Sequence, residues 1–477
     1  MEAQGFENSN SLMTKPKKSD ALGTEPISKL LVKQAVPASI GILVMSLNMI
    51  VDTIFVGRWI GPLAISAITV VIPITFFIGA IGLAIGIGGS SVLSRALGSG
   101  NNEKALQVFG NQTTLTFLVS GILAILGLVF QNYLIEFFGA DESFKELALT
   151  YYRIVMYGIV MLAMCMMGNN VIRAEGKPKF AMYAMMLPAV GNIFMDYILI
   201  NVFDFGMEGA AWATFISYAI CFAFILWFFI AKSELRLNWE SFKLKRDIVG
   251  EISSLSSVTL ARQAVISVLT ILLNNLLIVH GDALDVASYG IISRMLMFAL
   301  FPVIGVNQGF LPIAGYNYGA KKMERVRESI NTSIKYSGAL ALVIFAVIMV
   351  FPADIVSIFV SDKEGLSAET LAHNAEILSR TPSALRWVFA ATPIIVVQLI
   401  GASYFQAIGK AIPALLLSLT KQGFFLIPLI LILPNFFGIV GVWISFPIAD
   451  VLSTIVTGYF LNKEVRKMKS TVQVPDL

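Results

Sequence analysis

Long apolar stretches separated by short polar segments follow one another from about residue 34 to residue 461 of the 477-residue chain. Each stretch is long enough for an α-helix to cross the hydrocarbon core of a bilayer, which takes about 20 residues. The pattern predicts twelve membrane-spanning helices, at 34–56, 63–92, 107–130, 150–172, 180–202, 209–231, 252–280, 285–313, 330–352, 385–405, 412–434 and 438–461. We therefore expect an all-α polytopic membrane protein.

The composition supports a membrane protein and excludes several other classes. The chain is 57% hydrophobic and only 13% charged, with a mean hydropathy of +0.79, whereas about 25% of the residues of a soluble domain are charged. Its two cysteines, Cys165 and Cys221, both fall inside predicted spans, so neither a disulfide framework nor a cysteine metal motif is expected. The first 28 residues are polar and lack the apolar core of a signal peptide.

The basic residues indicate how the chain crosses the membrane. With the N-terminus inside, 26 of the 34 Lys and Arg fall in inside segments, including Lys410 and Lys421, and six fall outside. The other two, Arg262 and Arg294, lie within spans. Cytoplasmic loops carry an excess of Lys and Arg, so we expect both termini to be cytoplasmic. The net charge of +4 then reflects topology and does not indicate nucleic-acid binding.

The two halves of the chain resemble one another. Four pairs of segments recur in the same order: IGPLAISAI with HGDALDVAS, ALGSGNNEKA with NYGAKKMERV, IRAEGKPKFA with FQAIGKAIPA, and FGMEGAAWA with FGIVGVWIS. Six spans per unit give both halves the same orientation, so the repeat predicts two six-helix lobes around a central cavity. The expected divisions are a disordered tail (1–28), an N-lobe (29–231), a linker (232–247), a C-lobe (248–462) and a second tail (463–477).

Two equivalent lobes around one cavity suit alternating access. The chain has no Walker A motif, so ATP is not the expected energy source and a secondary transporter is predicted. The two histidines, His280 and His373, lie at or beyond helix ends and no span carries a catalytic constellation. We do not expect an enzyme.

Several motifs resemble the multidrug and toxic compound extrusion (MATE) family, closest to its DinF-like or MepA-like branch. They are NMIVDTIFVGRWIGPLAISAI, SRALGSGNNEKA, IRAEGKPK and FQAIGKAIPA. The resemblance implies the MATE fold, in the inner membrane of a bacterium. It implies export of organic, often cationic, compounds in exchange for H⁺ or Na⁺, with no other cofactor. The expected partners are small drug-like molecules and the bilayer, and one chain with two lobes can work as a monomer.

Asp52 interrupts the apolar run of the first span. A charge there costs about 2.5–3.5 kcal/mol on insertion scales, so an intramembrane carboxylate is a functional candidate. Asn48 shares its helical face, and Asn192 and Asp196 share one face of span 5. The resemblance implies that Asp52, Asn192, Asp196 and Thr214 form an N-lobe cation or proton site. The alternative is that these groups only hydrogen-bond between helices.

Two carboxylates in a pocket of low dielectric repel one another and lose hydration. Such a pair can hold a proton near neutral pH, or share a Na⁺ with the Asn and Thr oxygens. The sequence leaves both possibilities open. Pro37, in the same span as Asp52, is a candidate hinge because proline removes one helical hydrogen bond. A proline at the start of a helix is the other interpretation.

The C-lobe lacks the carboxylates that the NorM-like branch has in spans 7 and 10. Arg262, Gln263 and Gln398 stand there instead. Asp450 in span 12 is the clear intramembrane acid of this lobe, and one structural interpretation pairs it with Arg262.

Methionines are abundant in spans 4 and 5, and flexible thioethers can repack around varied ligands. The expected cavity residues are Asn48, Met161, Met185, Met295 and Gln398, with core or lipid-facing filler as the alternative. Gly98 and Gly319, in the equivalent loops of the two halves, are expected to adopt backbone angles closed to other residues. Gating contacts at the cytoplasmic face are the alternative.

Three other functions fit the sequence less well than an antiporter does. A flippase for a lipid-linked precursor would need a cationic cavity for pyrophosphate, whereas the N-lobe offers acids. A major facilitator transporter would carry a basic loop after span 2, which SRALGSGNNEKA does not match. A membrane receptor or scaffold would need an extramembrane domain, and the longest outside loop, about 353–384, is too short for one.

Overall fold

A computed structural model describes residues 18–360 and 368–472 of the chain. Over these residues the secondary structure is helical and contains no strand. Eleven helices are long and apolar enough to cross a membrane, or twelve if the bent pair α12–α13 forms one span. The all-α fold with twelve spans is therefore confirmed, and the spans fall where the apolar runs lie.

The N-terminal half contains η1 (Lys18–Gly23), α1 (Ile27–Trp59), α2 (Pro62–Gly98), α3 (Asn102–Val129), α4 (Gln131–Phe137), α5 (Lys145–Ala174), α6 (Pro178–Asp196), η2 (Tyr197–Val202) and α7 (Gly206–Ala231). A connection with the short helix η3 (Trp239–Phe242) leads to the C-terminal half. That half contains α8 (Arg246–His280), α9 (Ala283–Gly319), α10 (Met323–Val350), α11 (Pro352–Ser357), α12 (Ala368–Phe389), α13 (Thr392–Ala407), α14 (Ala411–Leu419), η4 (Thr420–Leu426), α15 (Ile427–Ile432), α16 (Pro434–Phe437) and α17 (Ile439–Val472).

Three spans depart from a regular α-helix. Span 5 continues from α6 into the π-helical turn η2, and span 11 contains the π-helical segment η4. Span 10 bends by 46° between α12 and α13, where Pro393 lacks an N–H at the start of the second helix. π-Helical turns in membrane helices commonly lie near functional groups, and both π segments adjoin or contain a charged residue.

The expected division of the chain needs correction at its ends. Residues 18–28 are ordered, because η1 packs Leu22 into the core and α1 begins at Ile27. Residues 1–17 of the expected tail lie outside the described residues. At the other end α17 continues to Val472, so the expected tail from residue 463 begins as helix.

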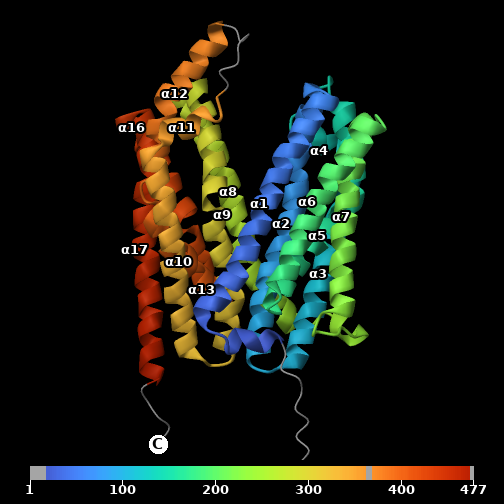
Figure 1. The fold of residues 1–477 in the computed structure, drawn as a ribbon, viewed down its shortest axis with the longest axis vertical. Coiled ribbons are helices and arrows are strands. Elements are labelled where there is room, and N and C mark those ends of the chain that lie inside the picture. Colours follow the sequence, from blue (N-terminus) through green and yellow to red (C-terminus); the bar gives the residue numbers. More distant parts are fainter. Residues whose placement is uncertain (1–17, 361–367, 473–477) are drawn as a thin grey trace, which may run out of the picture.

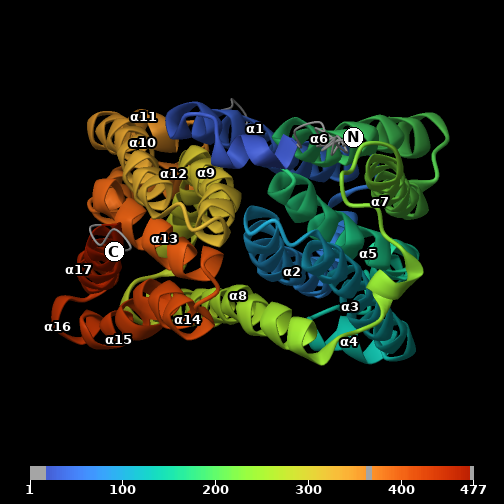
Figure 2. The ribbon, with the colours of Figure 1, turned by 90° about the horizontal axis from the view of Figure 1, so that it is seen from below.

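The described helices form two lobes that meet at one end of the molecule and diverge toward the other (Figure 1). The helix α1 begins and α17 ends at the joined end, which we call the terminal face. Figure 2, seen from that face, shows α1 and α8 along opposite edges of the boundary. Each packs on both halves: α1 on α6 and α9, α8 on α14 and α2.

Three hydrophobic clusters explain this shape. Near the terminal face one cluster contains residues of both halves, for example Leu31, Leu93 and Phe310. Toward the opposite face each lobe has a cluster of its own, around Ile159 in the N-lobe and around Leu273 in the C-lobe. The apolar contacts that join the lobes are thus confined to the half of the molecule near the terminal face.

Two glycines form equivalent contacts across the terminal face. A Cβ atom added to Gly98 would lie 1.9 Å from the carbonyl oxygen of Tyr316, and one added to Gly319 would lie 2.1 Å from that of Arg95. The repeat aligns Gly98 with Gly319 and Arg95 with Tyr316, so the two contacts are related by the pseudo-twofold axis. Neither glycine has a positive φ, so the expectation of special backbone angles is wrong. The absence of a side chain, which lets the lobes approach, is what both positions require.

Candidate functional site

Two carboxyl groups meet inside the N-lobe. Asp52 on α1 and Asp196 at the end of α6 lie within reach of a hydrogen bond between their side chains. Asp196 is fully buried, and neither of its oxygens has a hydrogen-bond donor among the described residues. Two carboxylates can bond to each other only when one of them carries a proton. The pair can therefore hold one proton between its two carboxyl groups.

Polar side chains surround the acid pair. The Asn48 amide donates to Asn192 Oδ1 at 3.1 Å, which ties α1 to α6 one turn from the carboxylates. Thr214 on α7 lies 3.3 Å from the Tyr151 hydroxyl, and its own hydroxyl donates to the carbonyl of Ala210. The fold thus brings Asp52, Asn192, Asp196 and Thr214, four predicted residues from three spans, into one region.

Two tyrosines near the pair were missed by the sequence analysis. Tyr151 of α5 interacts electrostatically with Asp52 and Asp196, and Tyr218 of α7 interacts with Asp52. Tyr218 lies one turn after Thr214 on the same helical face, so helical periodicity could have indicated it. Tyr151 gave no such signal, because it lies on another span and is not at a helical spacing from any of the predicted site residues.

Pro37 lies in the third turn of α1 and is buried. The helix continues unbroken from Ile27 to Trp59, so the interpretation as a helix-start proline is wrong. A proline at this depth leaves the carbonyl of Lys33 without its usual partner. Its neighbours Ala35 and Ser39 pack against Gly305 of α9, so a bend at Pro37 would change the contact between lobes.

The expected cavity residues do not form one group. Met185 packs on Gly41 of α1 and accepts a contact from Arg173, and Met295 packs on the C-lobe cluster. Gln398 is 4% exposed and donates to the carbonyl of Leu417 inside the C-lobe, so its side chain is not accessible from the space between the lobes in this conformation. Met161 is partly buried in α5, and Asn48 belongs to the acid site instead.

The intramembrane acid of the C-lobe has a different partner from the one expected. Asp450 of α17 forms an ion pair of 2.7 Å with Lys421 of η4. The interpretation that pairs Asp450 with Arg262 is wrong, because Lys421 is the charged side chain that acts on Asp450. The assignment of Lys421 to a cytoplasmic segment is wrong as well, because it lies in the middle of span 11.

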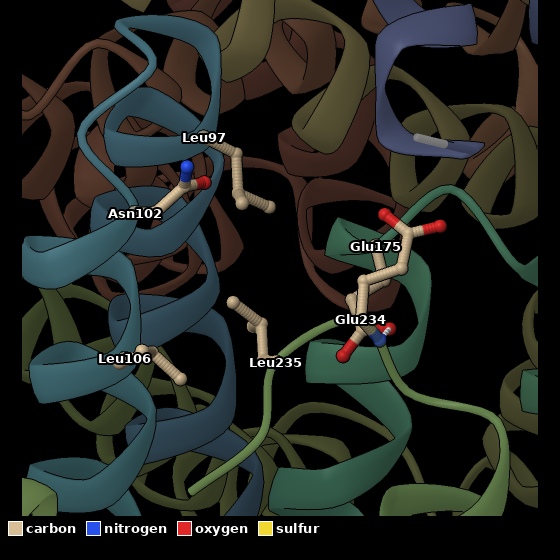
Figure 3. A pocket seen from close by; sticks show the side chains of 6 residues that line it. All are labelled: Leu97, Asn102, Leu106, Glu175, Glu234 and Leu235. Carbon is tan, nitrogen blue, oxygen red and sulfur yellow. Dashed lines mark hydrogen bonds between the residues drawn. The ribbon is translucent and has the colours of Figure 1, made fainter. Parts of the chain in front are cut away.

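A small pocket lies near the terminal face, where the connection between the halves meets the N-lobe. Leu97, Leu106, Leu235, Asn102, Glu175 and Glu234 line it (Figure 3). Glu175, between α5 and α6, is bonded to Lys177, to Ser233 and to the backbone N–H of Glu234. Burial raises the pKa of Glu175, whereas the bond from Ser233 and the charge of Lys177 lower it. These bonds fasten the connection between the halves to the N-lobe.

Comparisons with known proteins agree with this architecture. The family model described as MatE matches residues 37–198 and 258–432. The chain is 25% identical to the FAD transporter of Shewanella oneidensis over 94% of this chain and 97% of that protein. It is also 25% identical to the multidrug export protein MepA of Staphylococcus aureus, over 90% and 92%.

A solved structure has the same fold. It is titled as the outward-facing conformation of a multidrug resistance MATE family transporter of the MOP superfamily. It superposes with a TM-score of 0.87 at 25% identity, and the alignment covers 96% of this chain and all of that one. With the family model matching most of the chain, two six-helix lobes and a buried acid pair in the first of them, the chain belongs to the MATE family of transporters.

Proposed function

We propose that this protein is a secondary active antiporter that exports organic, often cationic, compounds in exchange for H⁺ or Na⁺. The observation that carries the proposal is the Asp52–Asp196 pair, in which Asp52 is partly buried and Asp196 is fully buried and lacks other donors. The relatives named for multidrug export support the class of substrate. The protein acts as a monomer in the inner membrane of a bacterium.

The coupling follows from a single occupant of the acid site. Two adjacent carboxylates in a membrane retain one positive charge between them, which a proton or a Na⁺ supplies. Asn192 and Thr214 add the neutral oxygen ligands that Na⁺ needs. If binding of the entering ion and binding of the departing compound are mutually exclusive, the protein exchanges one for the other and needs no additional coupling mechanism.

The orientation gives the direction of access. With both termini cytoplasmic, the terminal face is the closed inner face and the lobes diverge toward the outside (Figure 1). The lobes would then rock about the contacts between α1 and α9 and between α2 and α8.

The test is efflux of ethidium from proteoliposomes under a pH gradient and, separately, under a Na⁺ gradient. Transport driven by one gradient and lost in Asp52→Asn and Asp196→Asn supports the proposal and identifies the ion. Asp141→Asn, which removes an exposed carboxylate outside the spans, is the matched control. Unchanged coupling in both site variants would refute the assignment.

A second class of substrate is tested in the same vesicles. The relative named as an FAD transporter favours a flavin dinucleotide as an alternative cargo. Uptake of FAD but not of ethidium would move the substrate class from organic cations to anionic dinucleotides. A lipid-linked precursor becomes the next candidate if neither compound moves under either gradient.

A further inference from the structure

The two lobes differ in the partners of their intramembrane carboxylates. In the N-lobe, Asp52 and Asp196 face one another with no fixed cation between them. In the C-lobe, Asp450 faces the ammonium group of Lys421 at 2.7 Å. The side chain of Asp450 is 3% exposed and that of Lys421 is 15% exposed, so water does little to screen this pair.

The repeat places Asp450 at the level of the acid site, and it places Lys421 eight residues before the counterpart of Asp196 on span 11. Spans 11 and 12 are the counterparts of spans 5 and 6, which carry Asp196 and Thr214. In the aligned repeat Lys421 falls opposite Pro188, on the helical face of Asp196, and Asp450 falls opposite Tyr218, the neighbour of Asp52. Each lobe therefore buries a carboxylate at this level, and the C-lobe adds a lysine.

From this comparison we propose that the Lys421 ammonium group is a permanent counter-ion of Asp450. Because Asp450 is already neutralised, ion coupling is confined to the N-lobe. An ammonium group on a side chain neutralises a buried carboxylate as a bound ion would, but it cannot leave the protein. The π-helical segment η4 shifts the face of span 11 at this point and carries Lys421. Ser453 and Thr420 direct their hydroxyls to backbone carbonyls, so Lys421 remains the group that neutralises Asp450.

The inference rests on the proposed antiport in one respect, namely that the N-lobe pair is the coupling site. Proton uptake by the purified protein tests it without transport. The uptake is measured by pH-stat titration from about pH 8.5 to about pH 5.5 for the wild type, Lys421→Met and the double variant Lys421→Met/Asp450→Leu. The double variant removes both charges and keeps similar volumes, a change that buried pairs commonly tolerate.

We expect the wild type and the double variant to take up equal numbers of protons. Lys421→Met should take up about one proton more than the wild type, because its Asp450 is buried without a basic partner. If the wild type takes up one proton more than the double variant, Asp450 exchanges protons beside Lys421 and the inference is overturned. This comparison remains valid if Lys421→Met does not fold.

Ethidium transport supplies the second readout. The double variant should keep the ion-to-substrate ratio of the wild type, whereas loss of coupling in this variant would make Asp450 part of the coupling site and contradict the inference. A wild type that does not couple ethidium to any gradient would refute the proposed antiport, and the proton-uptake comparison would still decide the role of Lys421.

Discussion

The glycine contacts at the terminal face allow a quantitative test of how the lobes close. In Gly319→Ala the new Cβ would lie 2.1 Å from the carbonyl oxygen of Arg95, whereas real Cβ atoms essentially never approach within 3.0 Å. The obstacle is backbone, so the lobes must separate by at least about 0.9 Å or the helix must shift. Overpacking of this kind costs about 1–3 kcal/mol.

The free-energy cost of Gly319→Ala applies only to the conformation in which the lobes are in contact at the terminal face. A state in which the lobes part at the terminal face has no contact between Gly319 and Arg95, so the substitution leaves its free energy unchanged. A penalty of about 1–3 kcal/mol corresponds to a shift of roughly 5- to 150-fold in the equilibrium between the two states. Gly98→Ala, with its Cβ 1.9 Å from Tyr316, should act in the same direction.

Distances between spin labels across the terminal face measure the shift. We expect both variants to populate longer distances than the wild type and the control Gly290→Ala, which lies in α9 with nothing within 4 Å of its added Cβ. In the double variant one separation relieves both contacts, so the two effects should add incompletely. A distance distribution for Gly319→Ala that matches that of Gly290→Ala would refute the reasoning.

Three further predictions concern the same movement and the acid site. Pro37→Ala should slow ethidium transport more than it weakens ethidium binding, and equal losses in vesicle efflux and fluorescence binding would remove Pro37 as a hinge. Glu251→Gln breaks the two 3.0 Å ion pairs of Glu251 with Arg95 and Lys104 across the lobes and should weaken the closed terminal face by up to about 1 kcal/mol, whereas Glu251→Asp, which keeps the charge, should leave the labelled distances closer to those of the wild type. Asn48→Ala removes the bond that the Asn48 amide donates to Asn192 and should lower the unfolding free energy by about 1 kcal/mol in thermal or denaturant melts. Asn48→Asp, whose carboxylate cannot donate to Asn192 Oδ1, should lose the same bond.

The spans and the candidate acid residues could be predicted from the sequence. Apolar runs of membrane length fix the number of helices, because each backbone N–H and C=O in a bilayer must be bonded within its own segment. The i, i+4 spacing of Asn192 and Asp196 fixes their common face, and the cost of a charge in the membrane indicates Asp52. These are properties of one helix at a time, and the fold confirms the spans and brings Asp52 and Asp196 together.

The pairing of helices, in contrast, could be seen only in the fold. Lys421 falls within the predicted span at 412–434, but nothing in that span indicates that its charge is neutralised there, because its partner Asp450 is on another span. Gly98 and Gly319 look like turn residues, because the carbonyls they accommodate belong to the opposite lobe. Contacts between distant segments depend on how whole helices pack, and packing leaves no periodic signal in the sequence of either partner.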